Sequence, residues 1–414
     1  MFKLIKVTTG HTLSDDRIRL GESKFHTFEA PAVFAELRAT DPVHWYPPLR
    51  TWILTKYRDI RAVSRDSEHY SVAQGIDLNS AMLGELGAAE MFGDGGEFLA
   101  HVDPPRHTEL RRALAPAFAA RAVNAREQRI RGFATDLVER LEDGVPVDWV
   151  TIAQRLPIMV GLDLLGLPLE DVDQVRIWSE AMERLSYPLS ADEMKQVHAE
   201  FAPLSAYLCE QVERKRLAPG DDLISHLLTS HEQGTSLTAA NVLMLLITVL
   251  GAGNDTMRSL LTGMVLTLAE HPDQLARLVG DPGLSDATVE ETLRWITPAR
   301  GFLRTVSAAT ALRGRDFSPG ERVYLAYESG NRDEEVFNNP YVFDITAPRG
   351  QQASFGFGTH VCIGAAFARL EATALLRELV TRFPHFELAG VPQRMVTVLR
   401  NGWHTAPMVF HALR

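Results

Sequence analysis

Apolar residues recur every three or four positions along most of the chain, which is the spacing of amphipathic helices. The longest such segment, 237–271, is apolar on most of its faces and therefore predicts a helix at the centre of the molecule. At roughly 1.5 Å per residue it would extend about 50 Å if uninterrupted. Four further helical patterns precede it, over residues 123–141, 150–165, 171–184 and 191–215.

Short runs rich in β-branched and aromatic residues predict small sheets near both ends of the chain, each bounded by proline or glycine turns. The chain contains no internal repeat and no low-complexity linker, so we expect one mainly α domain over residues 1–414. Its β-rich parts are expected at about 41–56, 302–327 and 385–414, with 395–399 and 408–411 as paired strands, and its helical parts at about 57–300 and 363–383.

Charge and cysteine content exclude some classes of protein. The net charge is −11, from 42 Lys+Arg against 53 Asp+Glu, so we expect no nucleic-acid partner. The two cysteines cannot form a disulfide framework and fit a reducing compartment; Cys209 is interpreted as a helix packing residue. Residues 1–21 lack a signal-peptide core, and the uncharged run 242–253 is too short for a membrane span. We therefore expect a cytoplasmic protein with no membrane span.

A glycine-rich loop leads to the other cysteine. Gly356 and Gly358 allow the backbone to bend tightly before Cys362, and strong helix formers follow Gly364. Cys362 is therefore expected just before a helix N-terminus, where free amides and the helix dipole stabilise a metal-binding thiolate. Taken alone, a single cysteine is more often an ordinary buried residue, so both interpretations stay open at this point.

The surrounding residues resemble a known pattern. Phe355, Gly358, His360, Cys362 and Gly364 match all five fixed positions of the cysteine-ligand loop of the cytochrome P-450 monooxygenases. The resemblance extends from about residue 31 to 413 and implies the P-450 fold, a helical prism with a small β-rich part. It also implies haem b as cofactor, Cys362 as the iron ligand, and the rest of the loop as cofactor contacts. In this family the cysteine thiolate pushes electron density toward O–O cleavage.

Polar residues interrupt the apolar 237–271 segment. Glycine in a helix costs about 1 kcal/mol relative to alanine, and a buried carboxylate costs more unless it is partnered. Glycines and a carboxylate inside an apolar helix therefore suggest a functional role. The alternative is a kinked core helix in which Asp255 has a hydrogen-bond or ion-pair partner. Ala252, Gly253, Asp255 and Thr256 resemble the family motif in which an acid and an alcohol relay protons to bound dioxygen. Asp255 and Thr256 are thus the catalytic candidates.

A helix predicted from Pro104 carries His107 and Arg111 on one face, four residues apart. A solvated basic face would explain them without function. The segment resembles the family helix whose His and Arg reach a haem propionate, and Arg304 matches the second propionate-binding arginine.

Glu291 and Arg294 are spaced i,i+3 and could form an ordinary surface ion pair. They resemble the family pair that supports the cysteine loop, a network that Arg332 or Arg349 could join. Gln352 stands where many bacterial members have a histidine at the haem edge, which leaves that contact open.

The resemblance implies a substrate chamber built from residues 70–99, 178–201, 250–253 and 299–303. These segments are mostly apolar, so we expect a hydrophobic substrate of steroid, terpenoid or lipid-like size. Arg300 and Arg400 are exceptions that could bind a substrate carboxylate, with a solvent-facing or propionate-related role as the alternative. The possible substrate contacts are Leu250, Ala252, Gly253, Ala299, Arg300, Leu303, Leu399 and Arg400.

The implied activity is insertion of one oxygen atom of O2 into a C–H bond. Electrons are expected from a separate ferredoxin or flavodoxin with its NAD(P)H reductase, docked near Arg111, Arg112 and Arg369. Alternatives are a haem-thiolate sensor without turnover, a peroxide-driven peroxygenase that does not need the acid and alcohol pair, and a haem-free helical protein.

Overall fold

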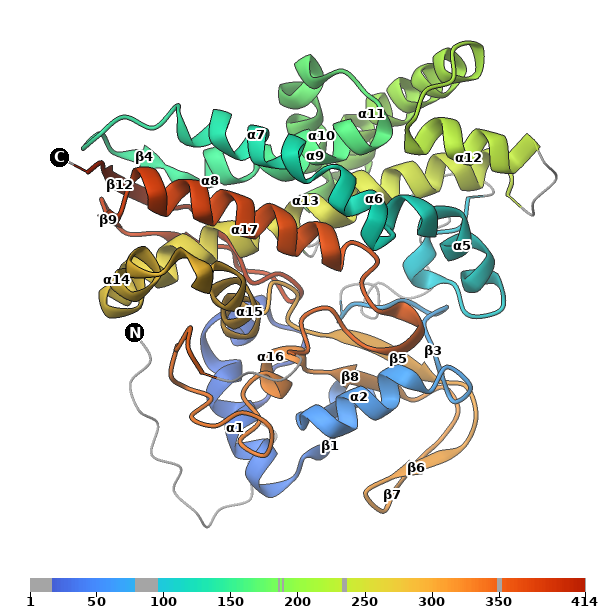
Figure 1. Ribbon diagram of the computed structural model, residues 1–414. Coiled ribbons are helices and arrows are strands. Elements are labelled where there is room, and N and C mark those ends of the chain that lie inside the picture. Colours follow the sequence, from blue (N-terminus) through green and yellow to red (C-terminus); the bar gives the residue numbers. More distant parts are fainter. Residues whose placement is uncertain are drawn as a thin grey trace.

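The computed structural model describes residues 17–78, 96–184, 187, 190–232, 237–347 and 352–413. Helices fill most of the molecule, and a mixed sheet with its own short helices lies at one side, below the helices in Figure 1. This arrangement confirms the mainly α fold class; the single domain over 1–414 stays a prediction. The main helices are α5 (Arg106–Phe118), α6 (Ala120–Ala125), α7 (Glu127–Val138), α8 (Trp149–Ala153), α9 (Arg155–Leu165), α10 (Val172–Arg184), α11 (Ala191–Leu217), α12 (Leu223–Glu232), α13 (Ala239–Glu270), α14 (Pro272–Gly280), α15 (Ser285–Ile296) and α17 (Ala365–Arg382).

Helix α13 forms the centre of the helical part, as its apolar pattern predicts. Thr238 caps its N-terminus: the hydroxyl accepts a bond from the Asn241 amide, and the Asn241 side chain accepts one from the Thr238 amide. The helix packs against α9, α10 and α15 and continues without interruption through its glycines. By length and composition, it alone among the described helices could cross a membrane, but 61% of its most apolar window is buried inside the molecule. Burial by neighbouring helices explains its apolar surface.

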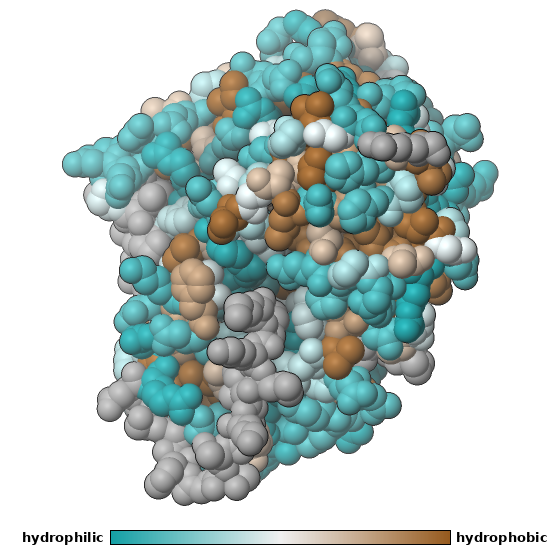
Figure 2. Space-filling view, turned by 90° about the vertical axis from the view of Figure 1, so that its left-hand side faces the viewer, coloured by the Kyte–Doolittle hydropathy of each residue, from teal (hydrophilic) through white to brown (hydrophobic). Residues whose placement is uncertain are grey.

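The surface is more polar than the interior around α13. The face in Figure 2 is mainly hydrophilic, and hydrophobic side chains occur on it in separate groups. The large apolar cluster that includes α13 lies inside, and it also takes in buried side chains of α7, α9, α15 and α17. Helix α17 packs along α7 and α15, which fixes the direction of the cysteine loop that precedes it (Figure 1).

The mixed sheet has the strand order β1-β2-β8-β5-β3, in which only β2 and β8 run parallel. Its two faces are both covered: Ile53 and Tyr324 pack on one side with α1, while Leu54 and Val323 pack on the other with α2. The elements are α1 (Ala30–Thr40), β1 (Val43–Tyr46), β2 (Thr51–Leu54), α2 (Tyr57–Arg65), β3 (Tyr70–Ser71), β5 (Phe302–Val306), β6 (Thr310–Leu312), β7 (Arg315–Phe317), β8 (Arg322–Leu325) and α16 (Tyr327–Gly330).

The C-terminal strands differ from the prediction. Residues 395–399 do not form a strand, because the chain turns there: the Thr397 hydroxyl accepts a hydrogen bond from the Arg400 amide at 2.7 Å, and the Leu399 carbonyl accepts one from Arg300. The predicted strand 408–411 is confirmed within β12, which pairs with β4 and β9. The bounds are β4 (Val147–Asp148), β9 (His385–Leu388), β10 (Gln393–Arg394), β11 (Trp403–Thr405) and β12 (Pro407–His411).

Candidate functional site

A cavity of about 330 Å³ lies between the middle of α13 and the loop before α17. Thr256 lines it from α13, and Cys362 lines it from the loop. Helix α5 contributes His107 and Arg111, and strand β5 contributes Arg304. Most of the remaining wall is apolar, so the cavity is a dry space with a few polar groups, which is the usual character of a small-molecule site. Apolar wall residues include Val72, Ile76, Leu99, Val160, Leu164, Val249, Leu260, Leu293, Pro298, Phe302 and Phe367.

The cysteine loop takes its shape from glycines. Gly356 and Gly358 have φ values of 68° and 69°, in the left-handed region that residues other than glycine rarely adopt. A Cβ on Gly358 would lie 2.4 Å from the carbonyl oxygen of Ser64, so another residue would displace the loop from α2. The Cys362 amide donates to the Phe355 carbonyl at 2.9 Å, and α17 begins three residues later. The thiol is exposed to the cavity.

Burial raises the pKa of the Cys362 thiol. A hydrogen bond from the Gly364 amide and the positive charges of Arg111 and Arg369 act in the opposite direction. The helix start therefore helps the thiolate, as the sequence predicts, but does not outweigh burial. A cation bound to the sulfur would hold it in its thiolate form, because a coordinated thiol loses its proton.

Four basic side chains form one wall of the cavity. The rings of His107 and His360 lie 4.1 Å apart between centroids. His107 Nδ1 and His360 Nε2 are buried and have no hydrogen-bond partner among the described residues. Burial and the neighbouring Arg111 lower the pKa of His107 to about 4. Burial also lowers the pKa of Arg304. Unpaired buried nitrogens beside two arginines fit an acidic ligand.

The other three basic side chains act on His360. Burial, then His107, Arg304 and Arg111, lower its pKa to about 3. Both histidines are thus neutral near pH 7, and each unpaired nitrogen can donate a hydrogen bond to an oxygen of a ligand that enters the cavity.

Thr256 and Asp255 are adjacent on α13 but face different surroundings. The Thr256 hydroxyl borders the cavity and donates to the Ala252 carbonyl at 3.0 Å. The Asp255 carboxylate is buried beside Arg400, with Oδ2 3.4 Å from Nη2. Burial raises the pKa of Asp255, while Arg400 and Arg258 lower it. Asp255 is a partnered buried acid, which sequence alone left open.

A second, polar pocket of about 550 Å³ opens beside this acid. Glu183 and Arg258 line it and form a buried ion pair, with an oxygen to nitrogen distance of 2.5 Å. Tyr187 and His404 also line it, with the Tyr187 hydroxyl 3.2 Å from His404 Nε2. Thr256, next to Asp255 in the chain, thus lines the apolar cavity, while Arg258, whose charge acts on Asp255, lines the polar pocket.

Glu291 and Arg294 form a fully buried, bidentate pair, with nitrogen to oxygen distances of 2.8 and 2.7 Å. The guanidinium also donates to the carbonyls of Asn331, Pro340 and Val342, so it joins α15 to the segment before the cysteine loop. This geometry excludes a surface ion pair.

Arg332 joins this network through the carbonyls of Arg294 and Trp295, and burial lowers its pKa to about 9. Arg349, the other predicted member, lies outside the described residues. Gln352 accepts a bond from the Ser354 amide at 2.6 Å and is buried, so it anchors the start of the loop and does not line the cavity.

Three of the predicted substrate contacts, Ala252, Gly253 and Ala299, line the cavity. Arg300 does not, because it pairs with Glu328 at 3.0 Å and donates to the Arg400 carbonyl. The remaining four also lie outside the cavity wall formed by the described residues: Leu250 in the main apolar cluster, Leu303 and Leu399 in the cluster on the sheet, and Arg400 beside Asp255. Of the predicted chamber segment 70–99, residues 79–95 lie outside the described residues.

Glu371 is a cavity residue that sequence reasoning missed. It lies on α17, its Oε2 has no hydrogen-bond partner among the described residues, and burial raises its pKa to about 8. A signal was present: Phe367, Glu371 and Leu375 are spaced i, i+4, i+8 on one helix face, and a single acid stands between two apolar residues.

Comparison with known proteins agrees with this geometry. The sequence pattern described as Cytochrome P450 matches residues 186–280 and 283–401. Cytochrome P450 107B1 of Saccharopolyspora erythraea is 34% identical over 87% of this chain and 89% of its own. Steroid C26-monooxygenase of Rhodococcus jostii is 30% identical over 89% and 79%. The crystal structure of CalO2 matches with a TM-score of 0.86 and 28% identity, over 95% of this chain and 99% of that one.

The chain belongs to the cytochrome P450 family and is a monooxygenase of that family. Haem is the family cofactor, and the cavity fits it on two counts. A thiol that can ligate iron faces the space, and the unpaired nitrogens of His107 and His360 lie beside Arg111 and Arg304, where the two carboxylates of a haem would find donors.

Proposed function

We propose that the protein hydroxylates a C–H bond of a hydrophobic small molecule of steroid, terpenoid or lipid-like size, with electrons from a separate ferredoxin or flavodoxin and its NAD(P)H reductase. The observation that carries the proposal is the pairing of Thr256 and Cys362 on the walls of one largely apolar cavity. The steroid monooxygenase of Rhodococcus jostii supports the substrate class.

Cys362 supplies the thiolate ligand of the haem iron, with Phe355 and Gly364 beside it. His107 and His360 would donate hydrogen bonds to the haem carboxylates, and the charges of Arg111 and Arg304 would neutralise them. When bound, the haem supplies the iron at which dioxygen is reduced, and the thiolate donates charge that favours O–O cleavage. Glu291 and Arg294 act through the loop and are positioning residues.

Asp255 and Thr256 transfer protons to the part of the cavity opposite Cys362. Asp255 takes a proton on the side of the polar pocket, where Arg258 and Glu183 lie, while Arg400 holds its carboxylate in place. Thr256 presents a hydroxyl to the cavity and passes the proton on through water. Burial favours the protonated form of Asp255, while Arg400 and Arg258 favour its charged form, so neither effect acts alone on the proton that the acid would pass on.

Ala252, Gly253 and Ala299 contact the substrate, because they line the same cavity as Thr256. Their small side chains leave the space open, and the substrate is held by apolar contacts with the surrounding wall. The redox partner docks on the side of Cys362, where Arg112 is exposed. Arg369 is less available, because it pairs with Glu290 and lies over the Phe355 ring.

Turnover with surrogate ferredoxin and reductase tests this proposal. We expect apolar compounds to change the iron spin state and NAD(P)H to drive formation of a hydroxylated product. A response to charged polar compounds alone would overturn the substrate class. Absence of NAD(P)H-driven product with every spin-shifting compound would favour a sensor, and peroxide-driven product that is indifferent to Thr256→Ala would favour a peroxygenase.

A further inference from the structure

Two histidines and a glutamate meet on the outer face of the C-terminal sheet. Strands β9 and β12 pair antiparallel, with His385 directly opposite His411. Side chains alternate between the faces of a strand, so Glu387, two residues after His385, points to the same side. Phe386 and Phe410, on the opposite face, are buried. The strand register alone thus brings all three polar side chains together at the surface.

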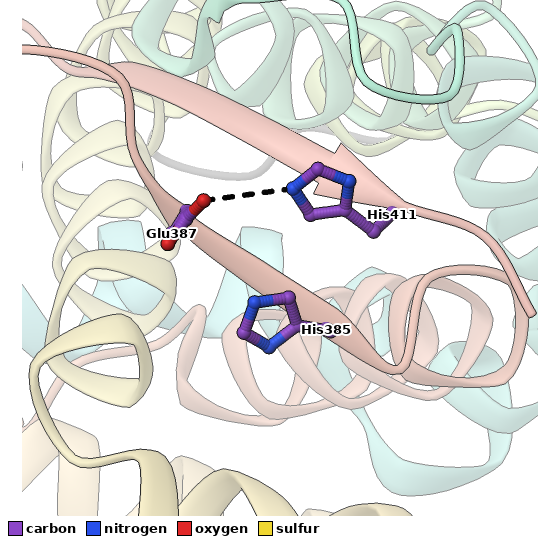
Figure 3. Close-up of side chains that lie close together, drawn as sticks. All are labelled: His385, Glu387 and His411. Atoms are coloured by element: carbon purple, nitrogen blue, oxygen red, sulfur yellow. Dashed lines mark ion pairs between the residues drawn. The ribbon is translucent and has the colours of Figure 1, made fainter.

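The ligating atoms of His385, Glu387 and His411 all lie within 4.8 Å of one another. His411 Nε2 is 3.7 Å from Glu387 Oε1, and the two imidazole rings are stacked with centroids 5.4 Å apart and 22° between their planes. Figure 3 shows the glutamate of β9 directed at the histidine of β12, with the second histidine beside them. A single ion could contact all three.

A simple surface ion pair explains only part of this cluster. It accounts for His411 and Glu387, but the His385 imidazole has no hydrogen-bond partner among the described residues and stacks on the other imidazole. None of the three residues lines the haem cavity, so the activity of the cavity does not explain them.

We propose that His385, Glu387 and His411 form a binding site for Zn²⁺. Two imidazoles and one carboxylate suit a borderline transition cation, whereas Mg²⁺ and Ca²⁺ prefer oxygen ligands throughout. Zn²⁺ bonds of about 2.0–2.2 Å in a tetrahedral site place ligand atoms roughly 3.3–3.6 Å apart. The observed spacing therefore has to close by about an ångström, which exposed side chains achieve by rotation. Water fills the fourth position.

The ion would join β9 to β12. Strand β12 also pairs with β4, so it connects the last residues of the chain to the start of α8. A cation that binds the folded pair and not the separated strands stabilises this end of the molecule, and the stabilisation grows with the logarithm of the cation concentration above its dissociation constant. The site is structural and leaves the haem reaction unchanged.

Calorimetric titration of the haem-loaded protein with ZnCl2 tests the proposal. Cys209 is exposed, contrary to the packing role predicted for it, so the Cys209→Ser background removes a competing thiol. We expect one saturable site. His385→Ala and His411→Ala should each weaken it at least about tenfold, since loss even of an outer partner costs a metal site that much. Mg²⁺ should give no signal, and the control His226→Ala, an exposed histidine on α12, should bind as the parent does.

Thermal unfolding gives a second measurement. Zn²⁺ should raise the unfolding midpoint of the parent and of His226→Ala, but not that of His385→Ala or His411→Ala. An unchanged haem spectrum shows that each variant is folded. The proposal is overturned if the parent shows no saturable binding, or if the two β-strand variants bind and respond to Zn²⁺ as the parent does.

Discussion

The rings of His107 and His360 lie in contact, 4.1 Å apart between centroids, and each has a buried nitrogen without a hydrogen-bond partner among the described residues. The two residues are far apart in sequence, one on α5 and one in the cysteine loop. Their unpaired nitrogens lie beside Arg111 and Arg304 in the cavity. Unpaired buried donors are costly, so this wall is built for an acidic ligand, which in this family is the haem.

The first prediction concerns haem retention. Arg111→Ala should increase the rate of haem transfer to apomyoglobin at least about tenfold, because it removes a charge-assisted bond worth roughly 1.5–3 kcal/mol. Arg112→Ala is the matched control: the neighbouring arginine is exposed and does not line the cavity. Equal transfer rates for the two variants would show that Arg111 does not hold the cofactor.

The second prediction concerns coupling of electrons to product. Thr256→Ala should divert most of the NAD(P)H consumption into hydrogen peroxide, because the hydroxyl that carries the proton is lost. Thr248 also lines the cavity from α13 and also donates to a carbonyl four residues earlier, so Thr248→Ala should stay coupled. The ratio of peroxide to product, measured per NAD(P)H, distinguishes them. Similar ratios in the two variants would argue against the relay.

The third prediction concerns support of the loop. Glu291→Gln should destabilise the protein by about 3–5 kcal/mol and lower the yield of haem-loaded protein, since it leaves the Arg294 charge buried and unpaired. Asp286→Asn on the same helix breaks an exposed pair with Arg377 and should change the free energy of unfolding by less than about 0.5 kcal/mol. Denaturant unfolding followed at the haem band measures both. A mild effect of Glu291→Gln would contradict a supporting role.

The fourth prediction uses the pKa of Glu371, which burial raises from 4.5 to about 8. Between these values the folded protein keeps a proton that the unfolded chain has lost, so the free energy of unfolding falls as pH rises toward 8. At pH 7 the raised pKa of Glu371 lowers the free energy of unfolding by about 3 kcal/mol relative to a carboxyl with an unshifted pKa. Glu371→Gln should therefore raise the thermal midpoint by a few degrees at pH 8 and less at pH 6. Glu378→Gln, half-buried on α17, should show no such pH-dependent gain.

A gain for Glu371→Gln that is equal at pH 6 and pH 8 would show that the carboxyl titrates outside this interval. Haem content, measured in parallel, separates this effect from altered cofactor binding, because Glu371 also lines the cavity.

Sequence predicted the parts of the site that depend on local pattern. Sequence pattern predicted a tight loop at the glycines before Cys362 and a helix after that residue, and the structure has both. It also predicted the long apolar helix α13. The direction in which a side chain faces could not be predicted as well from the sequence. Asp255 and Thr256 are neighbours in sequence, yet only the packing of Arg400 against α13 shows that the acid points away from the cavity.

Partners that are distant in the sequence explain the predictions that were wrong. Arg300 looked available for a substrate because Glu328, its partner, is 28 residues away in sequence. The strand predicted at 395–399 is wrong partly for the same reason: the Leu399 carbonyl accepts a hydrogen bond from the distant Arg300 amide, and a local turn adds to this, since the Arg400 amide donates to the Thr397 hydroxyl. Alternation of apolar residues indicates a strand but does not reveal a competing partner elsewhere in the chain.

The reduced carbon monoxide spectrum of Cys362→Ala tests the central claim most directly, with Cys209→Ser, the other cysteine of the chain, as control. We expect the parent and Cys209→Ser to give the absorption typical of thiolate-bound haem iron, and Cys362→Ala to lose it. Retention of that absorption in Cys362→Ala would contradict the assignment of Cys362 as the iron ligand.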